Sequence, residues 1–186
     1  MIKKREQILQ ATCNLIFEQG LQSVSMSQIA KQAGVGMGTI YNYFESKEQL
    51  VNALYGGLKA EMSQVILQGY AIDQPIIERF IQLFSNIARY GRDNPKAFQL
   101  VEQLTHSPYI QFSLKESESG LLRHLKQLFA EAAEQRMLKP LPFSIVGTLT
   151  YGASAALVRG HIAGKFVLDD ELIKVAAEAC WDMVKR

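Results

Sequence analysis

The feature that most constrains the fold is the stretch of residues 34–44. Three glycines fall within five positions, and a short run with three aromatic residues follows them. Ile40 and Phe44 are four positions apart, so they share one face of a helix. A short helix that ends at Gly34, a tight turn, and a second short helix from Thr39 to about Phe44 give a helix-turn-helix arrangement.

Flanking signals place further helices around this pair. Ser25 and Gln28 have the spacing of a capping box, which predicts that the first short helix begins there. Apolar residues recur at intervals of three and four over residues 3–19, and Gly20 is placed to end that helix. Ser46 is placed to cap a long helix that continues to about residue 68.

The second short helix has a divided surface. Ile40 and Phe44 face the core, whereas Thr39, Tyr41, Asn42 and Tyr43 cover the rest of the helix. An asparagine amide can bond an adenine edge, and tyrosine hydroxyls can reach phosphate oxygens, so this face suits the major groove of DNA. The alternative is a packed helical hairpin whose tyrosines carry only their hydroxyl groups to the solvent.

Composition alone does not point to nucleic acid. The chain has 186 residues, 48% of them hydrophobic, and a formal net charge of +2. Residues 1–55 carry five basic and four acidic side chains, so the prediction rests on motif and placement. The basic residues at 3–5 are natural phosphate contacts if a DNA backbone lies nearby, and otherwise a solvated helix end.

Several other classes of protein are disfavoured. The two cysteines, Cys13 and Cys180, are far apart, so buried free thiols are favoured over a redox or metal pair. The N-terminus lacks the apolar run of a signal peptide, which fits a cytoplasmic protein. Residues 141–158 carry no charge but contain four serine and threonine side chains, so we expect a buried helix rather than a membrane span.

Catalytic signatures are also lacking. The third glycine of a dinucleotide-binding motif is replaced by Thr39, and that stretch follows a helix rather than a strand. The three histidines are scattered, and residues 152–155 do not form a nucleophile elbow. We therefore expect no enzyme activity, no catalytic residues, no metal and no cofactor.

Residues 25–50, from Ser-Met-Ser-Gln-Ile-Ala through Ala-Gly-Val, Gly-Thr-Ile-Tyr and Phe to Ser-Lys-Glu-Gln-Leu, closely resemble the DNA-binding signature of TetR-family transcriptional regulators. The resemblance covers about the first 50 residues. It implies an all-α fold: a three-helix helix-turn-helix DNA-binding domain at 1–46, and a helical ligand-binding and dimerisation domain at 47–186.

The resemblance also implies roles for individual residues. The recognition helix would meet DNA through Met37, Gly38, Thr39, Tyr41, Asn42 and Tyr43. Ser25 and Ser27 fall where the preceding helix meets the backbone, although Ser27 is shorter than the residue often found there. Lys47 opens the next helix where the family commonly holds a phosphate, and free amides at a helix start favour the same anion.

The rest of the chain predicts further helices, beginning near Asp73, at Pro95, and over residues 121–138 and 141–164, with a last one from Asp169. Large side chains, a few of them with polar ends, are concentrated in this C-terminal part of the chain. They form either the core or the lining of an effector cavity of the kind the family has. The tentative lining residues are Phe80, Phe84, Phe98, His106, Tyr109, Phe112 and Leu125. The adjacent Gly56 and Gly57 indicate a bend or a close packing contact in the long helix.

Small residues recur every four positions over 152–164, which permits close approach of a second helix. In the family the last two helices of each chain form a four-helix bundle across a two-fold axis, although both can instead pack within one monomer. The tentative interface residues are Gly152, Ala156, Gly160, Leu172, Val175, Ala176, Ala179 and Met183. The resemblance therefore implies a homodimeric repressor released from a palindromic operator in double-stranded DNA by a small-molecule effector.

Overall fold

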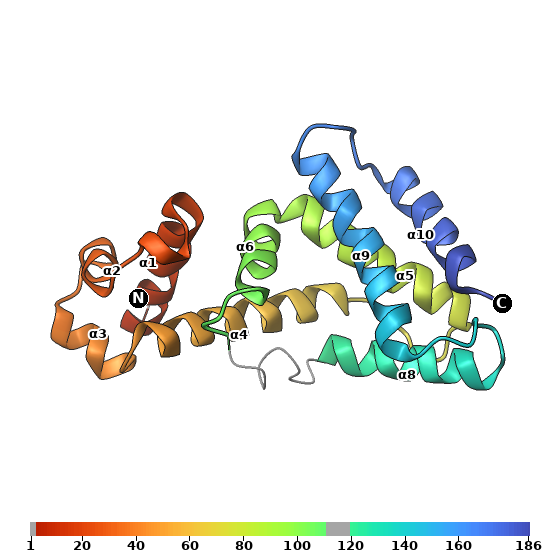
Figure 1. Ribbon diagram of the computed structural model, residues 1–186, viewed down its shortest axis with the longest axis horizontal. Helices are drawn as coiled ribbons and strands as arrows, with labels where there is room; N and C mark the ends of the chain where they lie inside the picture. Colours follow the sequence, from red (N-terminus) through yellow and green to blue (C-terminus); the bar gives the residue numbers. More distant parts are fainter. Residues whose placement is uncertain (1–2, 111–119) are drawn as a thin grey trace. The chain divides into compact units, whose positions relative to one another are not determined.

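The computed structural model of the chain describes residues 3–110 and 120–186. Within these residues every regular element is a helix, apart from one isolated β-bridge between Leu138 and Lys185 (Figure 1). The predicted all-α class is confirmed. The helices are α1 (Lys4–Gln19), the 3-10 turn η1 (Leu21–Ser23), α2 (Met26–Ala33), α3 (Met37–Tyr43), α4 (Lys47–Ile66), α5 (Ile76–Asp93), α6 (Pro95–Thr105), α8 (Gly120–Glu134), α9 (Phe143–Ile162) and α10 (Asp170–Val184).

The chain forms two compact units, and each is built from two separate segments. Unit 1 comprises residues 1–60 and 96–117, and unit 2 comprises residues 61–95 and 118–186. Unit 1 therefore includes the first part of α4 and nearly all of α6 in addition to α1, α2 and α3. The functional boundary between residues 46 and 47 stays a prediction.

Capping explains where the short helices of unit 1 begin and end. The Ser25 hydroxyl accepts from the Gln28 amide at 3.3 Å, and the Gln28 side-chain oxygen accepts from the Ser25 amide at 2.7 Å, so the predicted capping box is present. Gly34 ends α2 with φ 65°, a left-handed conformation that glycine adopts without strain. The α3 helix begins at Met37, two residues earlier than predicted, because the Gly36 carbonyl already accepts from the amides of Thr39 and Ile40 at 2.9 and 3.3 Å.

The core of unit 1 packs α1 against η1 and α2, and α2 against α3. Its members are the apolar faces that the helical spacing predicts, and they include Ile8, Leu15, Ile16, Ile29, Ile40, Phe44, Leu50 and Val51. The segment after α6 is bonded to α4, since the side-chain amide nitrogen of Asn52 donates to the Tyr109 carbonyl at 2.8 Å. The hydroxyls of Tyr55 and Thr105 lie 3.1 Å apart and add a second link.

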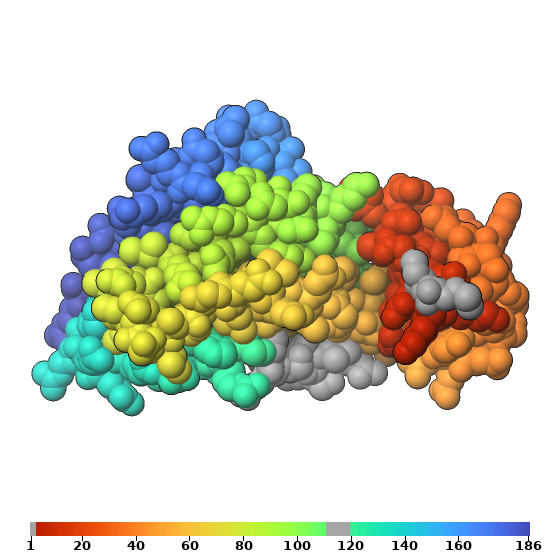
Figure 2. All heavy atoms as spheres, turned by 180° about the vertical axis from the view of Figure 1, so that it is seen from behind, coloured from red at the N-terminus to blue at the C-terminus, as the bar shows by residue number. Residues whose placement is uncertain are grey.

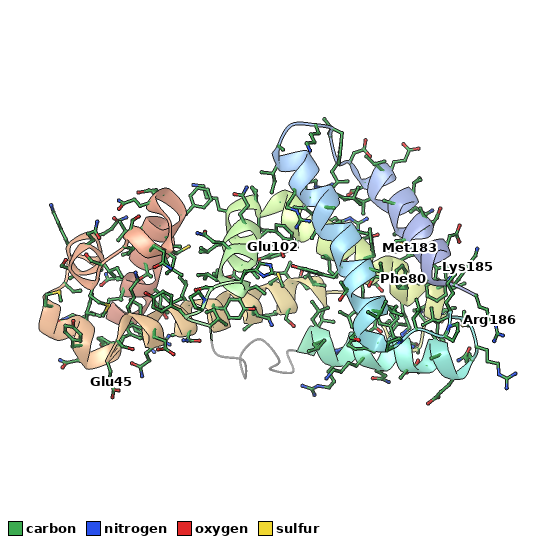
Figure 3. The ribbon with its side chains drawn as sticks, in the orientation of Figure 1. Glu45, Phe80, Glu102, Met183, Lys185 and Arg186 are labelled. Atoms are coloured by element: carbon green, nitrogen blue, oxygen red, sulfur yellow. The ribbon has the colours of Figure 1, made fainter. Side chains whose placement is uncertain are left out.

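In unit 2, α5 packs against α8, α9 and α10. Figure 2 shows α5 in yellow-green between the teal α8 and the blue pair of α9 and α10. Phe80, labelled in Figure 3, is 3% exposed, and its ring centroid lies 5.1 Å from that of Trp181 and 6.1 Å from that of Phe129. An aromatic cluster therefore fills the centre of this unit.

The start of α5 differs from the prediction. The helix begins at Ile76 rather than near Asp73, and the Pro75 carbonyl accepts from the Arg79 amide at 3.0 Å. Proline has no amide hydrogen and is therefore suited to the start of a helix, which explains the later beginning.

An ion pair joins α5 to α8, with the Arg79 side chain buried and the Glu131 side chain 32% exposed. Arg79 is 2% exposed, and its guanidinium bonds the Glu131 carboxylate and donates through Nε to the Tyr70 hydroxyl at 3.0 Å. The bond from Arg79 lowers the pKa of Glu131 below its ordinary value. Glu131 thus stays ionised where it neutralises the buried guanidinium.

The remaining helices follow the predicted pattern, except that α8 ends at Glu134, four residues before the predicted end at residue 138. The chain turns there at Arg136, whose φ of 56° is left-handed and cannot continue the helix. Asp169 caps α10 by accepting from the Leu172 amide at 2.8 Å. A side chain added at Gly56 or Gly57 would meet nothing within 4 Å, so neither glycine is explained by a close contact with the described residues. None of the helices described in this structure is long and apolar enough to cross a membrane.

Candidate nucleic-acid interface

The α3 helix presents two contrasting faces. Ile40 is 0% exposed and Phe44, the residue that follows the helix, is 2% exposed, so both anchor it to the core of unit 1. Tyr41 is 50% exposed and Tyr43 44% exposed. The other predicted contact residues on this face are exposed at Met37, Gly38 and Asn42 and half-buried at Thr39. The predicted division of the surface into a core face and a polar-aromatic face is therefore present in the structure.

Ser25 and Ser27 are exposed at the start of α2, and their hydroxyl oxygens lie 3.0 Å apart. The Ser25 hydroxyl takes part in the helix cap, so its first role is to begin α2. Among the described residues the Ser27 hydroxyl contacts only that of Ser25, so it is the freer of the two hydroxyls for a partner outside the chain.

A basic side chain lies next to the end of α3. The Arg5 guanidinium carbon lies 5.5 Å from the centroid of the Phe44 ring, although the two residues are far apart in sequence. Such cation–π pairs orient a guanidinium without neutralising it. The sequence suggested only a basic helix end here, because nothing in its local pattern shows which residue approaches Phe44.

Lys47 lies where α4 begins, and Ser46 caps that helix by accepting from the Gln49 amide at 3.1 Å. The Lys47 Nζ donates to the Leu21 carbonyl oxygen at 2.7 Å, and it lies 5.4 Å from the centroid of the Tyr109 ring. Burial lowers the pKa of Lys47. The ammonium is thus bonded within unit 1, a contact that the resemblance did not predict. In Figure 3 the nearby Glu45 projects outward from the turn between α3 and α4.

The residues predicted to line an effector cavity are divided between the two units. Phe98, His106 and Tyr109 belong to unit 1, where Phe98 is buried, Tyr109 is half-buried and His106 is exposed. Phe80, Phe84 and Leu125 belong to unit 2, where both phenylalanines are buried. Phe112 lies outside the described residues. The cavity therefore stays a prediction.

The predicted interface helices expose a series of aliphatic side chains. Ile145 is 45% and Leu149 39% exposed on α9, and Val175 is 54% exposed on α10. The other predicted interface residues are exposed at Ala156, Leu172, Ala179 and Met183 and half-buried at Gly152 and Ala176. We call this set, with Ile145 and Leu149 added and Gly160 left out, the α9–α10 face.

Gly160 is left out because its own chain covers it. A side chain added there would meet ring atoms of Phe166 at 2.6 Å. The absence of a side chain at position 160 thus has an explanation within the protomer, and it gives no support for contact with a second chain.

The described residues give little support for a metal site or a reactive thiol. Within residues 3–110 and 120–186, no group of three or more His, Cys, Asp or Glu side chains is arranged to hold a metal ion. Cys180 is buried, and burial raises the pKa of its thiol to about 11, so it stays protonated at neutral pH. Cys180 is thus buried as predicted, whereas Cys13 is only half-buried, so the predicted burial is wrong for Cys13.

An exposed polar-aromatic helix, anchored by two buried residues and preceded by a capped short helix and a glycine turn, defines the helix-turn-helix class of DNA-binding proteins. Comparison with known proteins narrows the class. Residues 8–54 match the family model described as bacterial regulatory proteins, tetR family, and residues 75–185 match the one described as tetracyclin repressor-like, C-terminal domain.

Individual relatives agree with both matches. A helix-turn-helix-type transcriptional regulator of Haemophilus influenzae is 25% identical over 182 residues, which cover 97% of this chain and 95% of the relative. A solved TetR-family structure from Vibrio parahaemolyticus is 31% identical with a TM-score of 0.86, and 99% of each chain is covered. FadR from Bacillus subtilis, solved in complex with stearoyl-CoA, shares the fold at 18% identity, with a TM-score of 0.71 and 96% of each chain covered.

The chain belongs to the TetR family of transcriptional regulators. Its homologues are regulators rather than enzymes, which supports the expected lack of catalytic activity at the level of the family. TetR-family regulators bind DNA and small-molecule effectors.

Proposed function

We propose that this protein is a homodimeric, cytoplasmic transcriptional repressor that binds a palindromic operator and is released from it by a small-molecule effector. The observation that carries the proposal is the exposed face of α3. Two tyrosines, an asparagine and a threonine surround a helix whose anchoring residues Ile40 and Phe44 are fully buried. The side chains on that face have the hydrogen-bonding groups and methyl groups that base edges and phosphates require.

The α9–α10 face supports the dimer. Ile145, Leu149, Gly152 and Ala156 follow the spacing of one helix face, and so do Leu172, Val175, Ala179 and Met183. Exposed apolar groups of this kind usually mark an interaction surface. A two-fold pairing would bury the same residues on both chains and give a four-helix bundle.

An effector would act by preferring one of two conformations of the dimer. If it binds the conformation in which the two α3 helices no longer match the spacing of the half-sites, DNA affinity falls. Linkage requires that DNA lower the affinity for the effector by the same factor. The aromatic side chains of both units suit an apolar or aromatic effector, and stearoyl-CoA, bound by the Bacillus subtilis relative, is a first compound to test.

The decisive experiment is selection of bound sequences from random duplex DNA with the full-length protein. We expect enrichment of a palindrome whose half-sites are about one helical turn apart, or a multiple of that distance. Enrichment of a single asymmetric site would contradict the homodimer, and lack of any enrichment would contradict sequence-specific DNA binding.

A further inference from the structure

The guanidinium of Arg79 is buried in unit 2 but only partly paired. Arg79 directly precedes Phe80, which Figure 3 labels on α5, and it is 2% exposed. Its Nε donates to the Tyr70 hydroxyl at 3.0 Å, and its Nη1 donates to the Glu131 carboxylate. Its Nη2 is also buried and has no hydrogen-bond partner among the described residues. Buried charged donors are rarely left unpaired in native proteins, so this nitrogen has room in its bonding for an acceptor from outside the chain.

Glu131 binds the guanidinium through one oxygen only. Its Oε2 accepts from Arg79, whereas its Oε1 accepts from the Gln127 side chain at 2.9 Å. The Glu131 side chain is 32% exposed and Gln127 is exposed, so this carboxylate lies on the solvent side of the pair. A carboxylate that is not tied to Gln127 could bond Nη1 and Nη2 with its two oxygens, which is the bidentate geometry that arginine favours.

Two aromatic rings lie beside this group. The ring centroids of Tyr70 and His124 are 5.3 Å apart with the rings edge to face, and both residues are half-buried. The His124 ring is fixed by its Nδ1, which lies 2.7 Å from the Gly120 carbonyl oxygen. The Arg79 guanidinium carbon lies 5.7 Å from the centroid of the Tyr70 ring. The free donor therefore belongs to a cluster that also offers a hydroxyl and partly accessible aromatic surface.

We propose that Arg79 and Tyr70 form a binding site for the carboxylate of a small organic acid with an apolar or aromatic body. Glu131 occupies the site in the free protein, and the ligand displaces it into solvent and bonds Nη2 as well. The site already accommodates a carboxylate, which favours this anion over the larger phosphate. This inference rests on the proposed function for the role of the acid as effector, whereas the binding itself requires no DNA.

The first test measures binding to the full-length protein without DNA by titration calorimetry at neutral pH. Sodium octanoate is the probe, and octanamide is the neutral control of the same length. Because a charge-assisted bidentate pair is available only to the acid, we expect the wild type to bind octanoate roughly tenfold more tightly than octanamide. Equal affinities for the two compounds would overturn the proposal.

The second test removes the resident carboxylate with Glu131→Gln. The ligand then has no carboxylate to displace, so its affinity should rise by roughly tenfold, while the affinity for octanamide should not change. Glu134→Gln removes the same charge from an exposed position on the same helix and is the matched control. It should behave as the wild type does. Octanoate affinity that does not rise in Glu131→Gln, or that rises equally in both variants, would refute the site.

The third test removes both partners with the double substitution Arg79→Gln and Glu131→Gln. Neither charge is then left buried without its partner, which favours retention of the fold. This variant should bind octanoate no more tightly than octanamide. A retained preference for octanoate would place its carboxylate elsewhere and would contradict the proposal.

Tyr70→Phe keeps the test decisive if the charge variants do not fold. It removes one hydroxyl from a half-buried residue and leaves both charges in place. Loss of one hydrogen bond to the ligand should weaken octanoate binding by about threefold and leave octanamide binding unchanged. Unchanged octanoate affinity in a folded Tyr70→Phe protein would remove Tyr70 from the site.

Failure of this inference and failure of the proposed function give different results. Equal binding of octanoate and octanamide would overturn the carboxylate site even if random duplex DNA yields a palindrome. A protein that selects no DNA sequence would contradict the proposed function. Tighter binding of octanoate to Glu131→Gln would still establish the site in that protein.

Discussion

The exposed faces of α3 and of α9–α10 are similar in exposure and different in chemistry. Tyr41 and Tyr43 are 50% and 44% exposed, and Val175 and Ile145 are 54% and 45% exposed. On α3 the apolar surface carries hydroxyls and an amide, whereas the α9–α10 face is aliphatic and interspersed with alanine and glycine. Under the proposed function both faces are interfaces. The hydroxyls and the amide on α3 favour a nucleic acid as its partner, whereas the aliphatic α9–α10 face favours a protein.

The two faces are also anchored differently. Ile40 and Phe44 hold a helix of seven residues, so the orientation of α3 depends on very few contacts. The buried side of α10 presents a longer row of residues, among them Ile173, Ala177 and Trp181, to the core of unit 2. A short helix with few buried contacts depends on the structure around it. Ser25 and Gly34 cap the preceding helix α2, and Lys47, just after α3, bonds the Leu21 carbonyl.

The largest effect is expected from Ala156→Trp, which tests the α9–α10 face. Two copies of the large ring would enter a two-fold interface, and overpacking at both positions should cost about 4 kcal/mol, or roughly a thousandfold in dimer dissociation. Sedimentation would measure the change, with Ala163→Trp just beyond the end of α9 as control. A variant that remains dimeric at micromolar concentration would remove Ala156 from the interface.

Tyr43→Ala tests the α3 face and should affect DNA binding without affecting the dimer. Since both half-sites lose a contact, the expected loss of operator affinity is about 3 kcal/mol, or roughly a hundredfold. Fluorescence anisotropy with the selected duplex would measure it. Ile72→Ala, at another exposed apolar side chain, is the control. Unchanged operator affinity in Tyr43→Ala would refute the groove assignment.

Ser25→Ala tests how strongly α3 depends on its neighbours. Loss of the cap of α2 should lower the stability of unit 1 by about 1 kcal/mol, measurable by hydrogen exchange of α2 amides. Ser27→Ala removes a hydroxyl that does not cap the helix, so its effect on these amides should be smaller. Equal effects of the two substitutions would show that the capping box contributes little.

Mild acid should weaken the unit that carries the α9–α10 face. The pKa of Glu131 in the folded protein lies below its ordinary value of 4.5, so the stability that this pair provides is present above that pH. It is lost as the pH falls through the folded pKa. Trp181, the single tryptophan, is buried in unit 2 and reports its unfolding. Glu131→Gln should show a smaller decrease in thermal midpoint between pH 6 and pH 3.5 than the wild type does.

The sequence predicted the helices and the division of α3 because local chemistry determines both. The capping box at Ser25, the glycine at 34 and the pair Ile40 and Phe44 act over a few residues, and each is found as predicted. Errors of two or three residues at the starts of α3 and α5 arose where a backbone carbonyl, at Gly36 or Pro75, already accepts the first helical bonds.

Contacts over long sequence separations could not be predicted in the same way. The bond from Lys47 to Leu21 joins residues 26 positions apart, and the position of Arg5 over Phe44 depends on how α1 packs. The cover of Gly160 by Phe166 depends on the turn after α9, so a pattern of small residues could not reveal it. Side-chain contacts such as these follow from tertiary packing, which periodicity does not encode.

The division of unit 1 into two segments also has a consequence for how the chain acquires its structure. The bond between Asn52 and Tyr109 spans 57 positions, and all of α5 lies between the two residues. Contacts of such high sequence separation form late and slow folding, because the entropy of loop closure is lost before they are made. During synthesis α1, α2 and α3 would therefore emerge and pack first. The bond between Asn52 of α4 and Tyr109 would form only after α6 and Tyr109 have left the ribosome.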